Sequence, residues 1–320
     1  MAFRLRLVPA KTRVRFTRLR TLWVAVSSAA VVGSLIVAAT VGLNFGVDFA
    51  GGLMIDVKTP KPADLRVMRS ALGELNLGEV ALQEFGAPDN VLIRIEASAA
   101  DEAMRERILV QVREALNKAV GPGVIERRVE FVGPKVSSEL VEGSALALGL
   151  ALLAIMIYIW FRFEWQFGVG GVLALCHDAI TTIGLFAVTG MEFNLTSIAA
   201  VLTIIGYSIN DTVVVYDRIR ENLRKYKAMP LDDVIDLSIN ETLSRTVMTA
   251  MTVFLTLVAL LIFGGEVIRG FAIAMLFGTV IGAYSSVYVA APILVYGGLK
   301  IGGSRGDADG DQAGTKPATP

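Results

Sequence analysis

Two side chains of opposite charge lie beside long apolar runs of the sequence. Asp211 follows the uncharged run 193–210, and Arg245 precedes the uncharged run 246–265. If both runs are antiparallel membrane helices with a rise of 1.5 Å per residue, Asp211 lies about 25 Å and Arg245 about 29 Å below the outer membrane surface. The two charges are then at similar depth. An ionisable group inside a membrane is costly and marks a functional site by default. An Asp–Arg pair there would respond strongly when the acid takes up a proton.

Polar side chains surround these two charges and also occur on a third apolar run, 165–191. By run, they are Thr203, Tyr207, Asn210 and Asp211; Arg245, Thr249, Thr252 and Thr256; and His177, Asp178, Thr181 and Thr182. Most of the steps are three or four residues, which places each set on one face of a helix. Carboxyl, imidazole and hydroxyl groups in series are what a proton relay requires. We therefore expect three polar faces to converge on one partly hydrated path.

Structural roles remain open for each of these groups. Asp211 could mark the cytoplasmic end of its helix, with Arg245 as an anchor at the membrane surface. His177 and Asp178 could be a hydrogen-bonded pair that fixes helix packing. The threonines at helical spacing could simply hold neighbouring helices together.

The elements that must position these residues are membrane helices. The chain has 320 residues, of which 54% are hydrophobic and 19% are charged, whereas an ordinary globular chain is roughly 25% charged. A spanning helix needs about 20 mostly apolar residues, and six stretches qualify. We expect them at 21–43, 143–162, 166–189, 194–216, 244–264 and 268–297.

The composition excludes several other classes of protein. The 30 basic and 30 acidic residues cancel, so no overall field attracts nucleic acid. One cysteine and one histidine exclude an internal disulfide and a Cys/His zinc cluster. We expect no cofactor, no metal and no enzymatic activity.

Lysine and arginine are unequally distributed between the two ends of these helices. Among the tails and short loops, they occur in the N-terminal segment 1–20, at Arg162, in the connecting loop 217–243 and in the tail 298–320, whereas the two short loops on the other side carry only Arg269. The positive-inside rule then places both termini in the cytoplasm. The first apolar stretch exceeds the roughly 7–15 residues of a signal peptide core, which favours a retained anchor. The tail, rich in Gly, Asp, Pro and Thr, is expected to be disordered.

Residues 44–142 form a domain on the outer side, between the first two helices. Strands are expected at 53–58, 80–85, 90–95 and 124–132, and helices at 62–75 and 99–119. The order β-α-β-β-α-β is that of a split βαβ, ferredoxin-like unit. Such a fold declares no activity, and the segment contains no nucleophile–base set, phosphate-binding loop or metal spacing.

Six segments of the chain resemble one known family. They are GVDFAGG (46–52), VEFVGPKVSSEL (129–140), CHDAITTIG (176–184), GYSINDTVVVYDRIREN (206–222), INETLSRTVMTAMTVF (239–254) and GAYSSVYVAAPIL (282–294). In type and order they resemble the SecF family, the smaller membrane subunits of bacterial SecD–SecF protein-export complexes. The likeness covers nearly the whole chain, apart from its two extreme ends.

The resemblance implies an α-helical polytopic membrane protein that is one half of an RND-type transporter, with SecD as obligate partner. It implies a bacterial inner-membrane subunit that uses the proton-motive force to draw unfolded preproteins outward from the SecYEG channel after SecA has pushed them. SecA and YajC are further candidate partners, alongside membrane lipid. An Asp and an Arg that serve proton transport in the family map by motif onto Asp211 and Arg245. A further essential Asp of the family belongs to SecD and is absent here.

The expected mechanism is chemiosmotic. Protons enter from outside, protonate Asp211 and weaken its hold on Arg245, after which the helices shift and move the outer domain. The expected proton pathway also includes Asn210, Thr249, Thr252, His177 and Asp178. The expected conformational junctions between the outer domain and the membrane part are Asp48, Gly51, Gly52 and Gly133.

Three other functions remain as alternatives. An intramembrane aspartyl protease would use Asp217 in a Tyr-Asp pair, but its GxGD partner segment is missing from the sequence. A small-solute RND exporter would need a second six-helix half in the same chain. A non-motor scaffold for the translocon would not need Asp211 and Arg245 to be charged.

Overall fold

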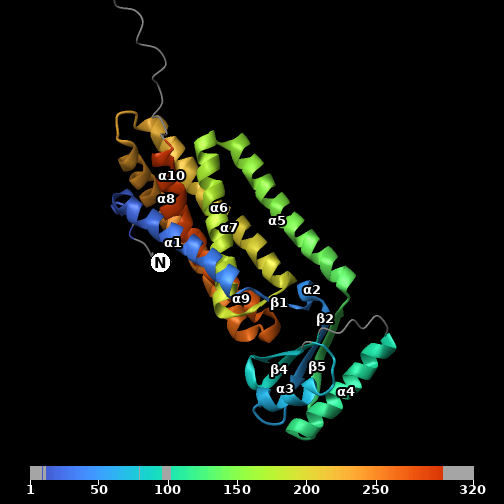
Figure 1. Cartoon of the computed structure of the whole chain (residues 1–320). Helices are drawn as coiled ribbons and strands as arrows, with labels where there is room; N and C mark the ends of the chain where they lie inside the picture. The colour runs from blue at the N-terminus through green and yellow to red at the C-terminus, as the bar shows by residue number, and fades with distance from the viewer. Residues whose placement is uncertain (1–8, 10–11, 79, 96–101, 298–320) are drawn as a thin grey trace, which may run out of the picture.

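The computed structural model describes residues 9, 12–78, 80–95 and 102–297. Within these residues, six helices are long and apolar enough to cross a membrane, which confirms the predicted number of spans. They form a bundle, and an α/β domain lies at one end of it (Figure 1). The tail predicted to be disordered, 298–320, lies outside the described residues.

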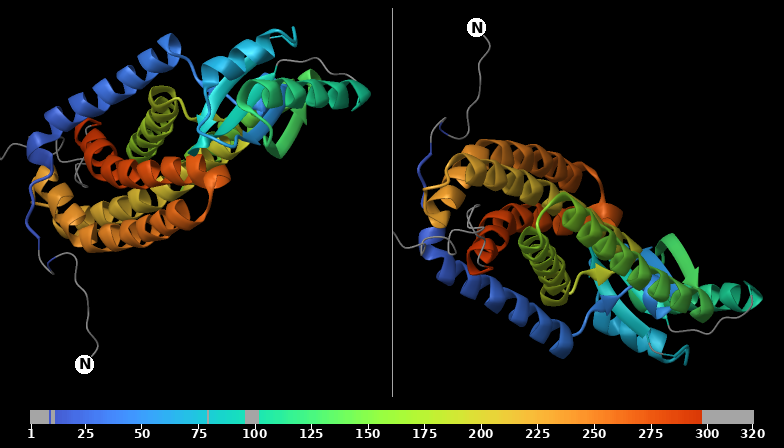
Figure 2. Two further views of the ribbon diagram at one scale, coloured as in Figure 1. Left: turned by 90° about the horizontal axis from the view of Figure 1, so that it is seen from below. Right: turned by 90° about the horizontal axis from the view of Figure 1, so that it is seen from above.

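Three of the spans form the centre of the bundle and three lie at its periphery. The spans are α1 (Arg20–Thr40, preceded by the 3-10 turn Thr17–Leu19), α5 (Pro134–Arg162), α6 (Trp165–Thr189), α7 (Leu195–Lys225), α8 (Leu231–Phe263) and α9 (Arg269–Ser285) with its continuation α10 (Ala291–Tyr296). In their most apolar stretches, α6, α7 and α9–α10 bury 61%, 44% and 56% of their residues, against 6%, 6% and 11% for α1, α5 and α8. Figure 2 shows α1 and α8 on opposite sides of the bundle, with α6 and α9 between them.

The predicted loop 217–243 is wrong in extent. Helix α7 continues to Lys225 and α8 already begins at Leu231, so only residues 226–230 connect them. The search for uncharged runs ended both helices too early. Their extensions are charged on the outside but keep a buried inner side, where Asn222 Nδ2 donates to Ser238 Oγ at 3.0 Å. For the same reason α5 begins at Pro134 rather than at 143.

The last span is interrupted. After α9, residues Ser286–Ala290 form a π-helical turn, and α10 follows with Pro292 in its first turn. Proline has no N–H to continue the hydrogen-bond ladder, and π-turns occur frequently at functional sites. The Tyr216 hydroxyl on α7 donates to the Ala290 carbonyl oxygen at 3.2 Å, so a side chain of the neighbouring helix contacts the irregular backbone.

Close contact between α7 and α9 depends on glycine. A Cβ on Gly278 would collide with Ile204, and one on Gly282 would lie 3.0 Å from Ser208 Cβ. Small residues let the backbones of membrane helices approach each other in this way. The contact packs the C-terminal half of α9 against the buried face of α7.

The domain that the sequence places on the outer side, called the outer domain below, has the predicted element order β-α-β-β-α-β. Its elements are β2 (Gly52–Lys58), α3 (Leu65–Gly73), β3 (Val80–Phe85), β4 (Ala87–Ile95), α4 (Glu102–Val120) and β5 (Ile125–Val132). The strands form an antiparallel sheet in the order β3-β4-β2-β5. Alternate residues of β2, such as Ile55 and Val57, form a core with Met68 of α3 and Val112 of α4. The turn expected between 85 and 90 is tighter, because β4 begins at Ala87 directly after Gly86, whose φ is +78°.

Candidate functional site

Asp178 connects the three central helices. This α6 carboxyl is 0% exposed. Its Oδ1 lies 2.9 Å from His177 Nδ1, and its Oδ2 accepts hydrogen bonds from Ser208 Oγ of α7 at 2.5 Å and from Ser285 Oγ of α9 at 2.7 Å. Burial of a carboxylate is costly, and hydrogen bonds to its oxygens offset that cost. The serine hydroxyls therefore fix the positions of α7 and α9 relative to α6.

The polar contacts continue from His177 toward the periphery. Its ring centroid lies 6.1 Å from that of Tyr284 on α9, and the Tyr284 hydroxyl is hydrogen-bonded to Ser27 Oγ of α1 at 2.8 Å. A set of polar side chains thus extends across four helices. Thr181 and Thr182 do not extend it, because their hydroxyls donate to backbone carbonyls one turn back on α6.

Asp211 lies on α7 one turn beyond Ser208 and is only 2% exposed. Arg245 acts on it electrostatically from α8, and Thr249 of the same helix lies beside it. Arg245 is close enough to influence Asp211 electrostatically across the α7–α8 interface, but the two form no ion pair within 4 Å among the described residues.

Several buried side-chain atoms on α7 and α8, one of them on Asp211, lack a hydrogen-bond partner among the described residues. They include Asp211 Oδ2 and Tyr207 Oη on α7 and Thr246 Oγ1 on α8. Buried polar atoms are nearly always hydrogen-bonded, so each exception needs an explanation. A carboxyl with a free oxygen next to a cation is an arrangement that can accept and release a proton.

The predicted pathway residues form two separate groups in the structure, and two of them, Asn210 and Thr252, belong to neither group. His177 and Asp178 lie together with Ser208 and Ser285, whereas Asp211 lies with Arg245 and Thr249. Asn210 and Thr252 lie exposed on the outer surface of α7 and α8. Sequence reasoning did not assign Ser208, Ser285, Tyr284 or Ser27 to the site, and it interpreted the helix face with Gly278, Gly282 and Ser285 as one of close helix packing. Ser208 and Ser285 lie within the quoted family segments, three residues before Asp211 and three after Gly282, and a search for small polar residues on the same helix faces would have found them.

Asp217, the residue on which the protease alternative depends, lies away from both groups. Its carboxylate forms an ion pair with Arg162 at the end of α5, with Oδ1 2.9 Å from Nη2. Its side chain is 45% exposed. Paired and solvated at the helix end, it is a surface charge.

The predicted junction residues lie where the outer domain meets the starts of two spans. Short helix α2 (Val47–Ala50) carries Asp48, whose Oδ2 accepts a hydrogen bond from Leu195 N at the start of α7, at 3.0 Å. The Phe49 carbonyl accepts one from Ser137 Oγ in the first turn of α5, at 2.6 Å. Strand β1 (Asn44–Phe45) also pairs with β6 (Glu192–Phe193), directly before α7.

Two glycines of this junction allow backbone conformations that other residues rarely adopt. Gly51 and Gly52 have φ of +72° and +102°. They turn the chain sharply from α2 into β2. Gly133 is the residue before α5 and has an extended backbone.

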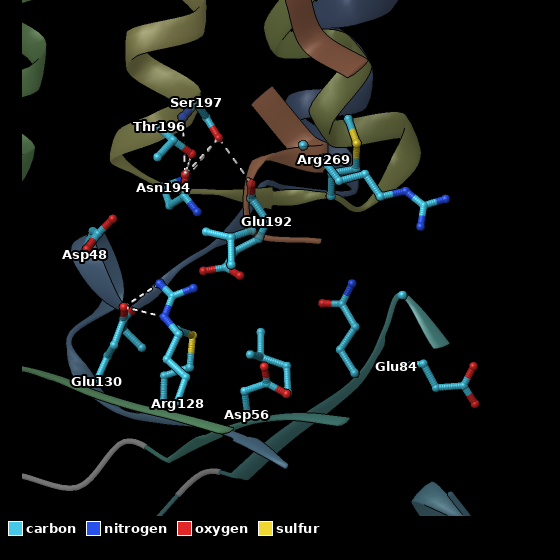
Figure 3. Close-up of a pocket in the computed structure, with 18 of the residues that line it drawn as sticks. Asp48, Asp56, Glu84, Arg128, Glu130, Glu192, Asn194, Thr196, Ser197 and Arg269 are labelled. Carbon is cyan, nitrogen blue, oxygen red and sulfur yellow. Dashed lines mark hydrogen bonds and ion pairs between the residues drawn. The ribbon is translucent and has the colours of Figure 1, made fainter. Parts of the chain in front are cut away.

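A cavity of about 410 Å³ separates the uncovered face of the sheet from the outer ends of the spans (Figure 3). Its charged lining residues are Asp48, Asp56, Glu84, Arg128, Glu130, Glu192 and Arg269. Arg128 Nε donates to Glu130 Oε1 at 2.6 Å. Burial, and then the nearby Asp48 carboxylate, raise the pKa of Glu192 above the ordinary value. The cavity is thus lined by an excess of acidic groups.

Two family models match this chain. Residues 112–300 match "Protein export membrane protein SecD/SecF, C-terminal", and residues 36–63 match the "SecD/SecF GG Motif". The second range contains Gly51 and Gly52. Together the matches cover the five spans from α5 onward, the end of α1 and the junction described above.

Relatives named "Protein translocase subunit SecF" are similar over most of the chain. The protein of Cereibacter sphaeroides is 49% identical over 99% of this chain and 98% of its own length. That of Rhodobacter capsulatus is 50% identical over 93% of both chains, and that of Rickettsia akari is 48% identical over 91% and 94%.

Two solved structures share the fold. The crystal structure of SecDF from Thermus thermophilus, a translocon-associated membrane protein, superposes with a TM-score of 0.82 at 32% identity over 91% of this chain. A "Super-membrane-facing form" of SecDF gives a TM-score of 0.61 at 30% identity. This chain spans only 40% and 39% of those two proteins. By its sequence along nearly its whole length, and by its fold, the chain belongs to the SecF family of protein translocase subunits.

Proposed function

We propose that this chain is the proton-responsive half of a protein-export motor in the bacterial inner membrane. The observation that supports this most directly is Asp211, buried on α7 with a free oxygen, opposite Arg245 of α8. An acid at that place holds a cation when ionised and releases it when protonated. The expected sequence of events is entry of a proton from the outer side, protonation of Asp211 and separation of α7 from α8.

The membrane potential supplies the driving force. One charge that crosses 100 mV gains about 2.3 kcal/mol, which biases a two-state equilibrium by more than tenfold. Several protons per cycle, or an added pH gradient, complete the change. In this proposal His177 and Asp178 form a second proton-holding group. Ser208, which lies one turn from Asp211 on α7, donates a hydrogen bond to Asp178 and so connects the two groups.

A movement of α7 would be transmitted to the outer domain by the contacts at the N-terminus of α7. Asp48 accepts a hydrogen bond from that terminus, and β1 pairs with β6 just before it. A shift of α7 along or about its axis therefore displaces α2, which leads directly into the sheet. We propose that this contact turns proton transfer into displacement of the domain that handles the exported chain.

We propose SecD as the obligate partner, seated against the exposed polar side of α7 and α8. Asn210, Arg245 and Thr252 are exposed there at membrane depth, where lipid would leave polar groups poorly solvated. The relatives' names and the SecDF structures support this assignment. SecYEG, SecA, YajC and unfolded preproteins are the further partners proposed. Both termini are proposed to face the cytoplasm, on the distribution of Lys and Arg.

Proton flux through the complex of this chain with SecD tests the proposal. Asp211→Asn should abolish proton uptake into proteoliposomes and proton-dependent export, while membrane insertion and SecD association persist. Asp217→Asn makes the same chemical change on the same helix, at its solvated end, and should leave flux unchanged. Full flux and export in the Asp211→Asn complex would exclude the motor and leave a scaffold.

A further inference from the structure

The segment before α1 is bound along the first turns of α8. The Val14 N–H donates to Asn240 Oδ1 of α8 at 2.9 Å, and Asn240 Nδ2 donates to the Val14 carbonyl oxygen at 2.8 Å. The two residues are 226 positions apart in the chain. Figure 2 shows the segment passing along the end of α8 before α1 begins on the other side of the bundle. Residues 12–20 are called the N-terminal strap below.

Two carboxylates of α8 hold the rest of the strap. Buried Asp236 accepts hydrogen bonds from the Thr17 N–H at 2.8 Å and from Thr17 Oγ1 at 2.9 Å. Asp232 Oδ2 lies 2.6 Å from Arg20 Nη1 in an ion pair. Asp232, Asp236 and Asn240 follow each other at steps of four, so they form one row along α8. The strap is therefore bound at three successive turns of α8.

An aromatic side chain packs the strap between α8 and the last span. Phe16 is buried in the same apolar cluster as Ile235 and Ile239 of α8. Its ring centroid lies 5.9 Å from that of Tyr288 in the π-helical turn, and the ring of Trp23 on α1 lies 4.7 Å from Tyr288. The strap thus joins α1, α8 and the interruption of the last span at one end of the bundle.

The row that binds the strap lies on the side of α8 away from Arg245. With 3.6 residues per turn, Asp236 and Asn240 are about 180° and about 140° around the helix from Arg245. The strap therefore occupies neither the side of α8 proposed for SecD nor the side opposite Asp211. Its contacts can be changed without changing the proposed proton site.

Helix α8 is fixed to the rest of the chain mainly through the half that binds the strap. Of the buried residues of α8, all but Leu257 lie between Val234 and Thr246. In its most apolar stretch, only 11% of the residues are buried. Segments with few buried contacts move at lower cost in free energy than well-packed ones. The strap end of α8 should therefore move least when the helix is displaced.

We infer that Asp236 and Asn240 are positioning residues that fix the strap end of α8, so that α8 separates from α7 by pivoting about that end and not by moving as a whole. The inference rests on the proposed separation of the two helices and adds its geometry. Arg245, two to three turns beyond Asp236, then moves away from Asp211 while the strap end stays in place.

Distances between spin labels on the full chain, purified with SecD, test the pivot. Cys176→Ser removes the single cysteine. One label pair, Asp233→Cys with Trp165→Cys, joins α8 to α6 at the strap end. The outer pair, Phe263→Cys with Val188→Cys, joins the same helices at the other end. All four labelled positions are exposed.

The two pairs should respond differently to loss of the Asp211 charge. Asp211→Asn, which removes the charge as protonation does, should lengthen the outer distance by about 2 Å or more, the size of ordinary helix shifts, and leave the strap-end distance unchanged. In Asp236→Ala with Asn240→Ala, the strap-end distance should lengthen as well, and its distribution should broaden. The matched control, Asp217→Ala, removes a carboxylate that joins two helices at the same end of the bundle but outside the strap, and should behave as the parent does.

Two results would overturn the inference. One is a strap-end distance that changes as much as the outer distance in Asp211→Asn with the strap intact. The other is an unchanged strap-end distance and width when Asp236 and Asn240 are both alanine. Thermal unfolding verifies that each variant is folded. Thr17→Val, which removes only the hydroxyl bond to Asp236, should broaden the strap-end distribution less and decides the question if the double variant does not fold.

Failure of the proposed function gives a different result. If Asp211→Asn changes neither distance, α7 and α8 do not separate when the acid is neutralised. The strap-end distribution in the alanine variant then still shows whether the strap fixes that end of α8.

Discussion

Asp48 of the outer domain and Leu195 of the membrane part are joined by a hydrogen bond from the Leu195 backbone N–H to Asp48 Oδ2, 3.0 Å long. The bond places a carboxylate at the positive end of the helix that carries Asp211. A negative charge at a helix N-terminus is worth about 0.3–1 kcal/mol. The bond links the helix of the proposed proton site to the short helix α2, which leads into β2.

Asp48→Ala should uncouple protein export from proton flux. We expect proton flux through the SecD complex to persist while export falls to the rate seen without a proton gradient, because the domain no longer follows α7. The control is Asp64→Ala, which removes a similar cap, since Asp64 accepts from Arg66 N and Val67 N at the start of α3. It should cost about 1 kcal/mol of domain stability but keep export coupled. Export loss in both variants would attribute the effect to stability.

The serines around Asp178 should stabilise the bundle. Ser285→Ala removes a donor to a fully buried carboxylate, and the loss of such a bond costs about 1–3 kcal/mol. Ser208→Ala should cost a similar amount, and the double variant more than the sum, because only the double variant leaves that oxygen without a donor. Thermal unfolding in detergent measures the difference. The exposed Thr252→Ala is the control and should change stability by less than about 0.5 kcal/mol.

Glu192 should make the outer junction more stable as the pH falls. Because its pKa is raised by burial and by Asp48, the folded state binds a proton more tightly than the unfolded state. Stability therefore decreases as the pH rises from the ordinary glutamate value through the raised one. Arg94 and Arg128 oppose this shift, and Glu130 adds to it.

Glu192→Gln should reduce this dependence and raise the stability at neutral pH. Unfolding measured from pH 4 to 8 compares the two proteins. Asp56, whose pKa is raised mainly by burial, contributes to the slope that remains, which Asp56→Asn should reduce further. An identical pH profile for the parent and Glu192→Gln would contradict the assignment.

A larger residue at position 278 should prevent the close packing of α7 against α9. Gly278→Val places atoms where Ile204 packs, and such overpacking typically costs about 1–3 kcal/mol. It should also weaken the Ser285–Asp178 bond, which depends on the same approach. Gly168→Val on α6 is the matched control, since a Cβ at that position would have open space around it. Equal destabilisation of both would point to glycine's backbone alone.

Much of this architecture was predictable from the sequence. The six spans follow from apolar runs, because transfer of each helix into lipid depends only on its own residues. The similar depth of Asp211 and Arg245 follows from the rise of a helix and the alternation of direction. The element order of the outer domain follows from its alternating strands and its two amphipathic helices.

The partners of Asp178 were decided only by the tertiary structure. Spacing placed it on a polar helix face, but which helices meet that face depends on the rotation and separation of whole helices. Those are set by the close α7–α9 contact at Gly278 and Gly282. The same holds for Asp48 and Leu195, which are 147 residues apart in the chain. Burial in lipid is a property of each segment by itself, whereas a hydrogen bond between segments requires the packed bundle.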